Sequence, residues 1–213
     1  MADIMAMARQ RAEQYGAKNV VVPTAQTGKT VKRAMQIMGS QYRYFAVGNP
    51  STSYDRGWCL HKGISPELRG ELEHLGITVI LEGQSITQAL AFGGDRRLIN
   101  GKFFDVWGKK VPRNVPLDTL MQNISSEGAH NLILVLTHAM EWMGEAGRVC
   151  IECTLMAADS GVLPLNELCV VLATPVDPEV PDACMIISPA KTVDIFTWKF
   201  QIADFTQVPK GKT

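Results

Sequence analysis

The residues with the clearest chemical potential lie together in residues 24–30. This segment contains three threonines, a glycine and a lysine, and it directly follows the apolar residues 20–22. Hydroxyl groups and a lysine can donate hydrogen bonds to an oxyanion, and a helix beginning here would add partly positive N–H groups. A glycine also lets the backbone approach a ligand closely. The segment therefore predicts a site for a phosphate-bearing ligand, formed by Thr24, Gln26, Thr27, Gly28, Lys29 and Thr30.

The same segment has two other interpretations. A Walker A loop of an ATPase or GTPase needs a glycine five positions before its second glycine, and Pro23 stands at that position. Because proline has no N–H to donate to a phosphate, the sequence argues against a Walker A loop. The second interpretation stays open: Thr27 could simply be the N-cap of a surface helix.

A second group of reactive residue types lies between Cys150 and Asp159. Glu152 and Asp159 are seven residues apart on one predicted helix. That spacing is a rise of about 10.5 Å, too far for the two carboxyl groups to share a proton. Asp159 falls in the last turn, where the helix dipole disfavours a negative charge, so we expect backbone N–H groups or a cation to hold it.

Cys150 and Cys153 form a C-x-x-C motif, which can carry redox chemistry or provide half of a zinc site. No second pair of cysteines or histidines has matching ligand spacing. Free cysteine is often a small core residue, so packing is the favoured prediction for both thiols.

The elements that position these residues follow from the hydrophobic pattern. Helices are predicted over residues 4–15, 31–38, 65–76, 128–143 and 148–160, and strands over residues 19–22, 44–47, 77–80, 168–173, 183–187 and 198–205. Continuously apolar strands that alternate with helices are typical of a parallel sheet with right-handed crossovers. The chain is therefore predicted to be one α/β domain over residues 1–213.

In an open α/β sheet, ligands bind beyond the carboxyl ends of the parallel strands. Polar residues that follow the predicted strands are therefore candidates for the rest of the site, namely Asn49, Ser51, Gln84, Ser85 and Thr174. Each of them could equally be an ordinary polar loop residue.

Residues 93–127 interrupt the regular alternation. The part over residues 93–118 is rich in glycine and carries the aromatic residues Phe103, Phe104 and Trp107, and we interpret it as an excursion that contains a hairpin. An aromatic cluster in such a segment could form a contact surface.

Composition excludes several classes of protein. Among 213 residues, 21 Lys and Arg balance 21 Asp and Glu, so no net field attracts nucleic acid or an anionic membrane. No apolar run approaches the roughly 20 residues of a membrane span. Five cysteines, mostly inside apolar runs, fit reduced thiols and predict a cytoplasmic location.

Three stretches together resemble a known family. They are the strand, threonine-rich turn and helix over residues 20–38, then residues 149–152, and the more specific residues 156–164. They are similar to a mostly archaeal family of proteins that resemble the C-terminal α/β domain of pyruvate kinase. The resemblance implies a three-layer α/β/α sandwich with a mixed, mostly parallel five-stranded sheet whose last main strand is antiparallel. It does not imply kinase activity, because the catalytic barrel of pyruvate kinase has no counterpart here.

For ligand binding, the resemblance implies flavin mononucleotide (FMN) or a similar nucleotide with its phosphate at residues 27–30. Residues 93–127 are longer than the family's usual connection and could form a lid or a contact within a homo-oligomer. Three hypotheses result. The first is a small-molecule binding protein for a phosphorylated ligand. The alternatives are a flavin-dependent oxidoreductase with Cys150, Glu152 or Asp159 near the reacting centre, and a regulatory or interaction module that uses residues 93–118.

Overall fold

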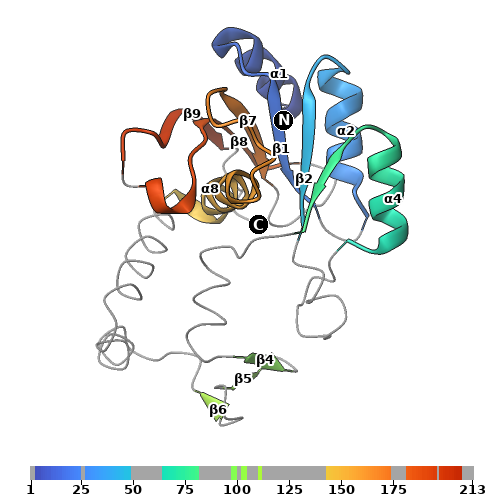
Figure 1. The fold of residues 1–213 in the computed structure, drawn as a ribbon, viewed down its shortest axis with the longest axis vertical. Helices are drawn as coiled ribbons and strands as arrows, with labels where there is room; N and C mark the ends of the chain where they lie inside the picture. Colours follow the sequence, from blue (N-terminus) through green and yellow to red (C-terminus); the bar gives the residue numbers. More distant parts are fainter. Residues whose placement is uncertain are drawn as a thin grey trace.

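The computed structural model of the protein shows a sheet with helices on both faces (Figure 1). The parts of the chain that the structure describes are residues 3–24, 27–48, 64–81, 97–99, 102–104, 110–111, 143–173, 181–195 and 197–207. Within these residues, no helix has both the length and the apolar character that a membrane span needs.

The main sheet has six strands in the order β3-β2-β1-β7-β8-β9. Strands β3, β2, β1 and β7 run parallel, whereas β8 is antiparallel to β7 and β9 is antiparallel to β8. The strands are β1 (Asn19–Pro23), β2 (Arg43–Val47), β3 (Thr78–Ile80), β7 (Cys169–Ala173), β8 (Ala183–Ser188) and β9 (Gln201–Gln207). Strands β1 and β7 lie at the centre, and their valines are fully buried, as expected for strands covered on both faces.

Local sequence signals determine where the helices begin and end. Helix α1 (Ile4–Tyr15) begins at Asp3, whose carboxylate accepts the N–H of Met5, and ends at Gly16 in the left-handed conformation. Helix α4 (Pro66–His74) begins at Ser65, whose hydroxyl accepts the N–H of Leu68. The remaining helices are α2 (Lys29–Met38), α8 (Gly144–Asp159) and the short 3₁₀ helix η1 (Thr192–Asp194).

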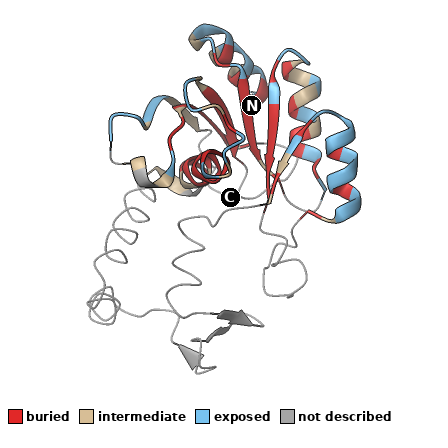
Figure 2. Ribbon diagram, viewed as in Figure 1, coloured by how far each residue is buried: buried red, intermediate tan, exposed pale blue. Residues whose placement is uncertain are grey.

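The two faces of the main sheet carry separate apolar cores (Figure 2). One core lies between the sheet and the helices α1, α2 and α4, where residues such as Val20, Val22 and Leu72 pack together. The other core lies between the sheet and α8, and it includes Val21 and Val171. The alternation of Val20, Val21 and Val22 between the two cores reflects the two-residue period of a strand.

The α/β class predicted from the sequence is confirmed, with three differences in detail. The main sheet has the six strands that the hydrophobic pattern predicts rather than the five that the resemblance implies, because β9 pairs with β8 at the edge of the sheet. Helix α8 begins a full turn earlier than predicted, since two glycines in its first turn hid the pattern. The last strand begins at Gln201 rather than Trp198, because residues 197–200 form a turn closed by the N–H of Phe200 and the carbonyl of Thr197.

The excursion contains a second, small antiparallel sheet. Strands β4 (Arg97–Ile99) and β5 (Lys102–Phe104) pair as a hairpin, as predicted, and β6 (Lys110–Val111) pairs with β5. The rest of residues 93–127 lies outside the described residues, as does the helix predicted over residues 128–143 except for its last residue, Met143.

Candidate functional site

The candidate site lies at the carboxyl edge of the parallel strands. Because β3, β2, β1 and β7 run parallel, their carboxyl ends meet at one edge of the sheet. From β1 the chain continues into α2 on one face, whereas the helix before β7, α8, packs on the other face. The connections therefore reverse between β1 and β7, and such a reversal is where open α/β sheets bind their ligands.

Thr24 is the first predicted ligand residue after β1, and its polar groups bond within the protein. Its N–H donates to the carbonyl of Val47 at 2.7 Å, and its hydroxyl donates to the carbonyl of Val22 at 3.0 Å. The side chain is buried. Thr24 thus joins the ends of β1 and β2 and fixes where the following turn begins.

Gly28 has a structural reason to be glycine that the sequence did not reveal. It is the N-cap of α2 with a φ of 61°, a left-handed conformation that favours glycine. A Cβ at this position would lie 3.2 Å from Leu68 Cδ1 and 3.2 Å from Leu72 Cδ2 on α4. The missing side chain therefore allows α4 to pack against the start of α2, rather than serving only the approach of a ligand.

The first turn of α2 carries the other predicted residues of the segment. Thr27 and Lys29 are exposed, whereas Thr30 is buried. The Thr27 hydroxyl accepts the N–H of Lys29 at 3.4 Å, a long and weak bond. The helix begins at Gly28 rather than at Thr27, and its first intrahelical bond runs from the N–H of Lys32 to the carbonyl of Gly28.

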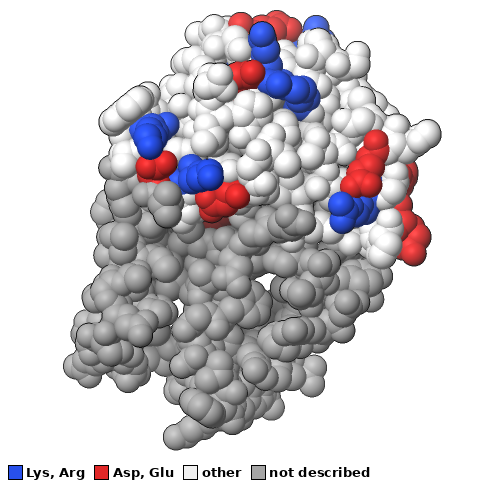
Figure 3. Space-filling view, viewed as in Figure 1, with Lys and Arg blue, Asp and Glu red and all other residues white. Residues whose placement is uncertain are grey.

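Lys32 ties α2 to α4. The Nζ of Lys32 lies 2.6 Å from Glu71 Oε1. Several other cations also lie beside acidic groups on the protein surface, as Figure 3 shows for one face. The position of α2, and hence of its N-terminus, is therefore set by α4 through this ion pair and the leucine contacts at Gly28.

Among the described residues, apolar side chains surround the ends of β2 and β3. The N–H of Gly48 donates to the carbonyl of Ile80 at 2.9 Å. A Cβ on Gly48 would lie 2.8 Å from Ile64 Cδ1 and 2.9 Å from Leu81 Cδ2.

Several predicted site residues fall outside the described residues, although their neighbours are at this edge. Gly48, Leu81 and Ala173 end the described segments there. The residues concerned are Gln26, Asn49, Ser51, Gln84, Ser85 and Thr174. The structure adds Asp182, which the sequence prediction missed. Its N–H donates to the carbonyl of Ala173 at 2.8 Å, so it lies at the same edge.

The two carboxylates of α8 have separate partners. Glu152 is buried and lies 3.2 Å from the guanidinium of Arg148 one turn earlier. Asp159 accepts the N–H of Thr192 at 2.9 Å and its hydroxyl at 2.5 Å. Of the two partners expected for Asp159, backbone N–H groups or a cation, the structure shows a backbone N–H, joined by the hydroxyl of the same residue.

The C-x-x-C thiols are part of the core. Cys150 and Cys153 are buried as free thiols, and burial raises the pKa of each well above its usual range. Burial also raises the pKa of Cys169 to about 12 and that of Cys184 to about 11. A neutral thiol is a poor nucleophile and metal ligand, so this environment supports packing. In the described part of the chain, no three His, Cys, Asp or Glu residues are grouped so as to hold a metal ion.

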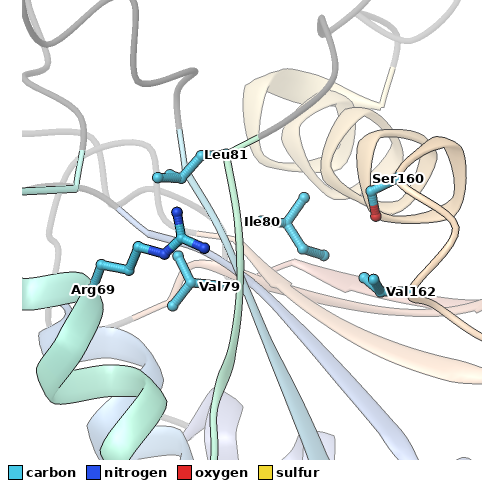
Figure 4. Close-up of a pocket in the computed structure, with 6 residues that line it drawn as sticks. All are labelled: Arg69, Val79, Ile80, Leu81, Ser160 and Val162. Carbon is cyan, nitrogen blue, oxygen red and sulfur yellow. The ribbon is translucent and has the colours of Figure 1, made fainter. Parts of the chain in front are cut away.

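One hollow in the described part is lined by none of the predicted ligand residues that the structure describes (Figure 4). It has a volume of about 210 Å³ and lies along β3, between α4 and the end of α8. Its lining consists of Arg69, Val79, Ile80, Leu81, Ser160 and Val162.

Comparisons with known proteins give no match, either to a protein-family model or to a curated protein.

Proposed function

We propose that this protein binds a small phosphorylated molecule at the carboxyl edge of its parallel strands, with the phosphate at the start of α2. The observation that carries the proposal is the strand order, because β1 and β7 are neighbours whose connecting helices lie on opposite faces. Helix α2 begins directly after the turn that follows β1, so the positive end of its dipole lies at that reversal point.

Thr27 and Lys29 are the side chains best suited to bind the phosphate, because both are exposed in the first turn of α2. Lys29 would supply the charge, and Thr27 would supply a hydroxyl donor. Thr24 and Gly28 would act indirectly, since they fix the turn through Val47 and the α4 leucines. Asp182 could accept hydrogen bonds from hydroxyl groups elsewhere on the ligand.

FMN is the first ligand to test, because it is what the family resemblance implies. The antiparallel pairing of β8 with β7 agrees with the sheet of a pyruvate kinase C-terminal-like fold, to which β9 would be an addition. The buried thiols and Glu152 have no assigned chemistry in this proposal, because they lie within the core around α8.

Paired ligands that differ only in phosphate test the proposal. Titration calorimetry and thermal unfolding would compare FMN with riboflavin, and ribose 5-phosphate with ribose. We expect the phosphorylated member of at least one pair to bind about tenfold or more tightly, because a charge-assisted hydrogen bond contributes about 1.5–3 kcal/mol. At a ligand concentration of about 100 times Kd, the free energy of unfolding should rise by about 2.7 kcal/mol.

Variants locate the binding. Lys29→Ala should weaken binding of the phosphorylated ligand about tenfold and leave binding of the dephosphorylated one unchanged. Lys18→Ala is the matched control, because Lys18 is an exposed lysine that precedes β1 at the opposite edge of the sheet. If neither phosphorylated ligand binds better than its partner, or if both lysine variants weaken binding equally, the proposed site is wrong.

A further inference from the structure

The hollow along β3 has the shape of a site for an added strand. Among the described strands, β3 lies at the end of the sheet and pairs only with β2. The hollow is lined from both faces of the sheet, with Arg69, Val79 and Leu81 on the α4 side of β3 and Ile80, Ser160 and Val162 on the α8 side (Figure 4). An occupant that contacts both linings must lie in the plane of the sheet, beside the strand.

The backbone of Val79 points into this space. The carbonyl of Ile80 accepts the N–H of Gly48, which follows β2, so the peptide groups of Ile80 face β2. Backbone groups of successive residues in a strand point in opposite directions, and those of Val79 therefore face away from β2. This orientation provides one N–H and one C=O at the side of β3 that faces away from β2, where no described strand pairs.

The two outer strands of the main sheet differ in how they are protected. Strand β9 has a register shift opposite Ile186 and Ile187, and it carries the charged residue Asp204. Bulges and charges are the usual means of preventing pairing at a sheet edge. The residues of β3, Thr78–Ile80, include no charge and no proline, and their pairing with β2 is regular.

The volume argues against a whole small molecule. At about 210 Å³, the hollow is below the range of roughly 300–1,000 Å³ that is usual for ligand pockets. It is better suited to a few side chains of an extended peptide. Its α4 side carries the guanidinium of Arg69, which Glu73 holds through a 2.8 Å contact, and its α8 side presents the apolar groups of Ile80 and Val162.

We propose that β3 binds an extended peptide of a partner protein by strand addition. The peptide carries acidic side chains towards Arg69 on the α4 side and branched apolar side chains towards Ile80 and Val162 on the α8 side. Backbone hydrogen bonds to Val79 hold the peptide, and the alternation of its side chains gives specificity. The short length of β3 limits the pairing to about three residues.

Two labelled heptapeptides test this proposal by fluorescence polarisation. One alternates valine with glutamate, and the other alternates valine with lysine. The glutamate peptide should bind about fivefold more tightly to the unchanged protein, the upper range for an exposed ion pair. Arg69→Glu should reverse this preference, and Val79→Pro, which removes the outward N–H, should weaken the glutamate peptide about tenfold.

If Val79→Pro lowers stability, the Arg69→Glu variant still tests the proposal. Thermal unfolding of each variant shows whether it is folded. Leu75→Ala, which removes an exposed apolar side chain after the end of α4, is the control and should change neither affinity. Equal binding of the two peptides, absence of binding by both, or a preference that Arg69→Glu does not reverse would each overturn the proposal.

Discussion

The helices on the two faces of the main sheet are buried to very different extents. Helices α1, α2 and α4 each keep an exposed outer side, with the usual alternation of buried and exposed residues. Helix α8 is buried at nearly every described position between Ala146 and Ala158. A helix that is covered all round belongs to the interior of the protein. The same residue types therefore have different roles on the two faces, and an Arg–Glu pair or a glycine on α8 is part of the core.

Removing a carboxylate gives the largest expected contrast between the faces. Arg148–Glu152 on α8 and Arg69–Glu73 on α4 are both one-turn pairs, but the glutamate side chains are 8% and 47% exposed. Glu152→Ala should lower the free energy of unfolding by about 3 kcal/mol, because it leaves a mostly buried guanidinium without this carboxylate. Glu73→Ala should cost about 0.5 kcal/mol or less. Urea unfolding measures both, and equal costs would refute the distinction between the faces.

The effect of a glycine-to-alanine substitution on the free energy of unfolding should have opposite signs on the two faces of the sheet. A Cβ on Gly147 would lie 2.7 Å from Met143 Cβ and 3.2 Å from the ring of Phe205, so Gly147→Ala should destabilise by about 1–3 kcal/mol. A Cβ on Gly70 of α4 would meet no atom within 4 Å. Gly70→Ala should therefore stabilise by about 0.5–1 kcal/mol through helix propensity alone. Stabilisation by both substitutions would mean that α8 and β9 are not closely packed.

The buried thiols should make the protein less stable in alkali. Burial raises the pKa of Cys184 from its ordinary value of 9.0 to about 11 and that of Cys169 to about 12. Above pH 9 the unfolded chain therefore releases protons that the folded protein keeps, and stability falls as pH rises. Each thiol should lower the free energy of unfolding by about 1.4 kcal/mol per pH unit. This fall should stop near pH 11 for Cys184 and near pH 12 for Cys169, where the thiol of the folded protein also loses its proton.

Urea unfolding between pH 8 and pH 10 measures this slope. Cys184→Ala should make the slope shallower by the contribution of one thiol, whereas Gln201→Ala, at an exposed position of the neighbouring strand β9, should leave it unchanged. Alkylation by iodoacetamide gives an independent measure, because a buried neutral thiol reacts only when the protein opens. Rapid alkylation of Cys150 in the folded protein would contradict the packing role of the C-x-x-C motif.

The sequence predicted most of the fold because its signals are local. Asp3 and Ser65 cap their helices, Gly16 ends α1, and the apolar strand at residues 20–22 is buried as expected. The site was harder to predict because its determinants are distant in sequence. The N–H of Thr24 donates to the carbonyl of Val47, and Gly28 lies against the leucines of α4. Nothing within the turn itself indicates either contact. A segment that was predicted to bind a ligand therefore also packs against β2 and α4.

The smallest expected effect concerns the segment that follows β8. Asp159, at the end of α8, accepts two hydrogen bonds from Thr192 and so fixes the start of η1. Asp159→Ala should destabilise by about 1 kcal/mol and should expose Lys191 to trypsin earlier than in the unchanged protein. Asp194→Ala is the control, because Asp194 lies in the same segment and pairs with the half-exposed Lys199, and it should have little effect. If Asp159→Ala leaves both stability and cleavage unchanged, Asp159 is not the anchor of this segment, and a role in binding becomes the better account of its carboxylate.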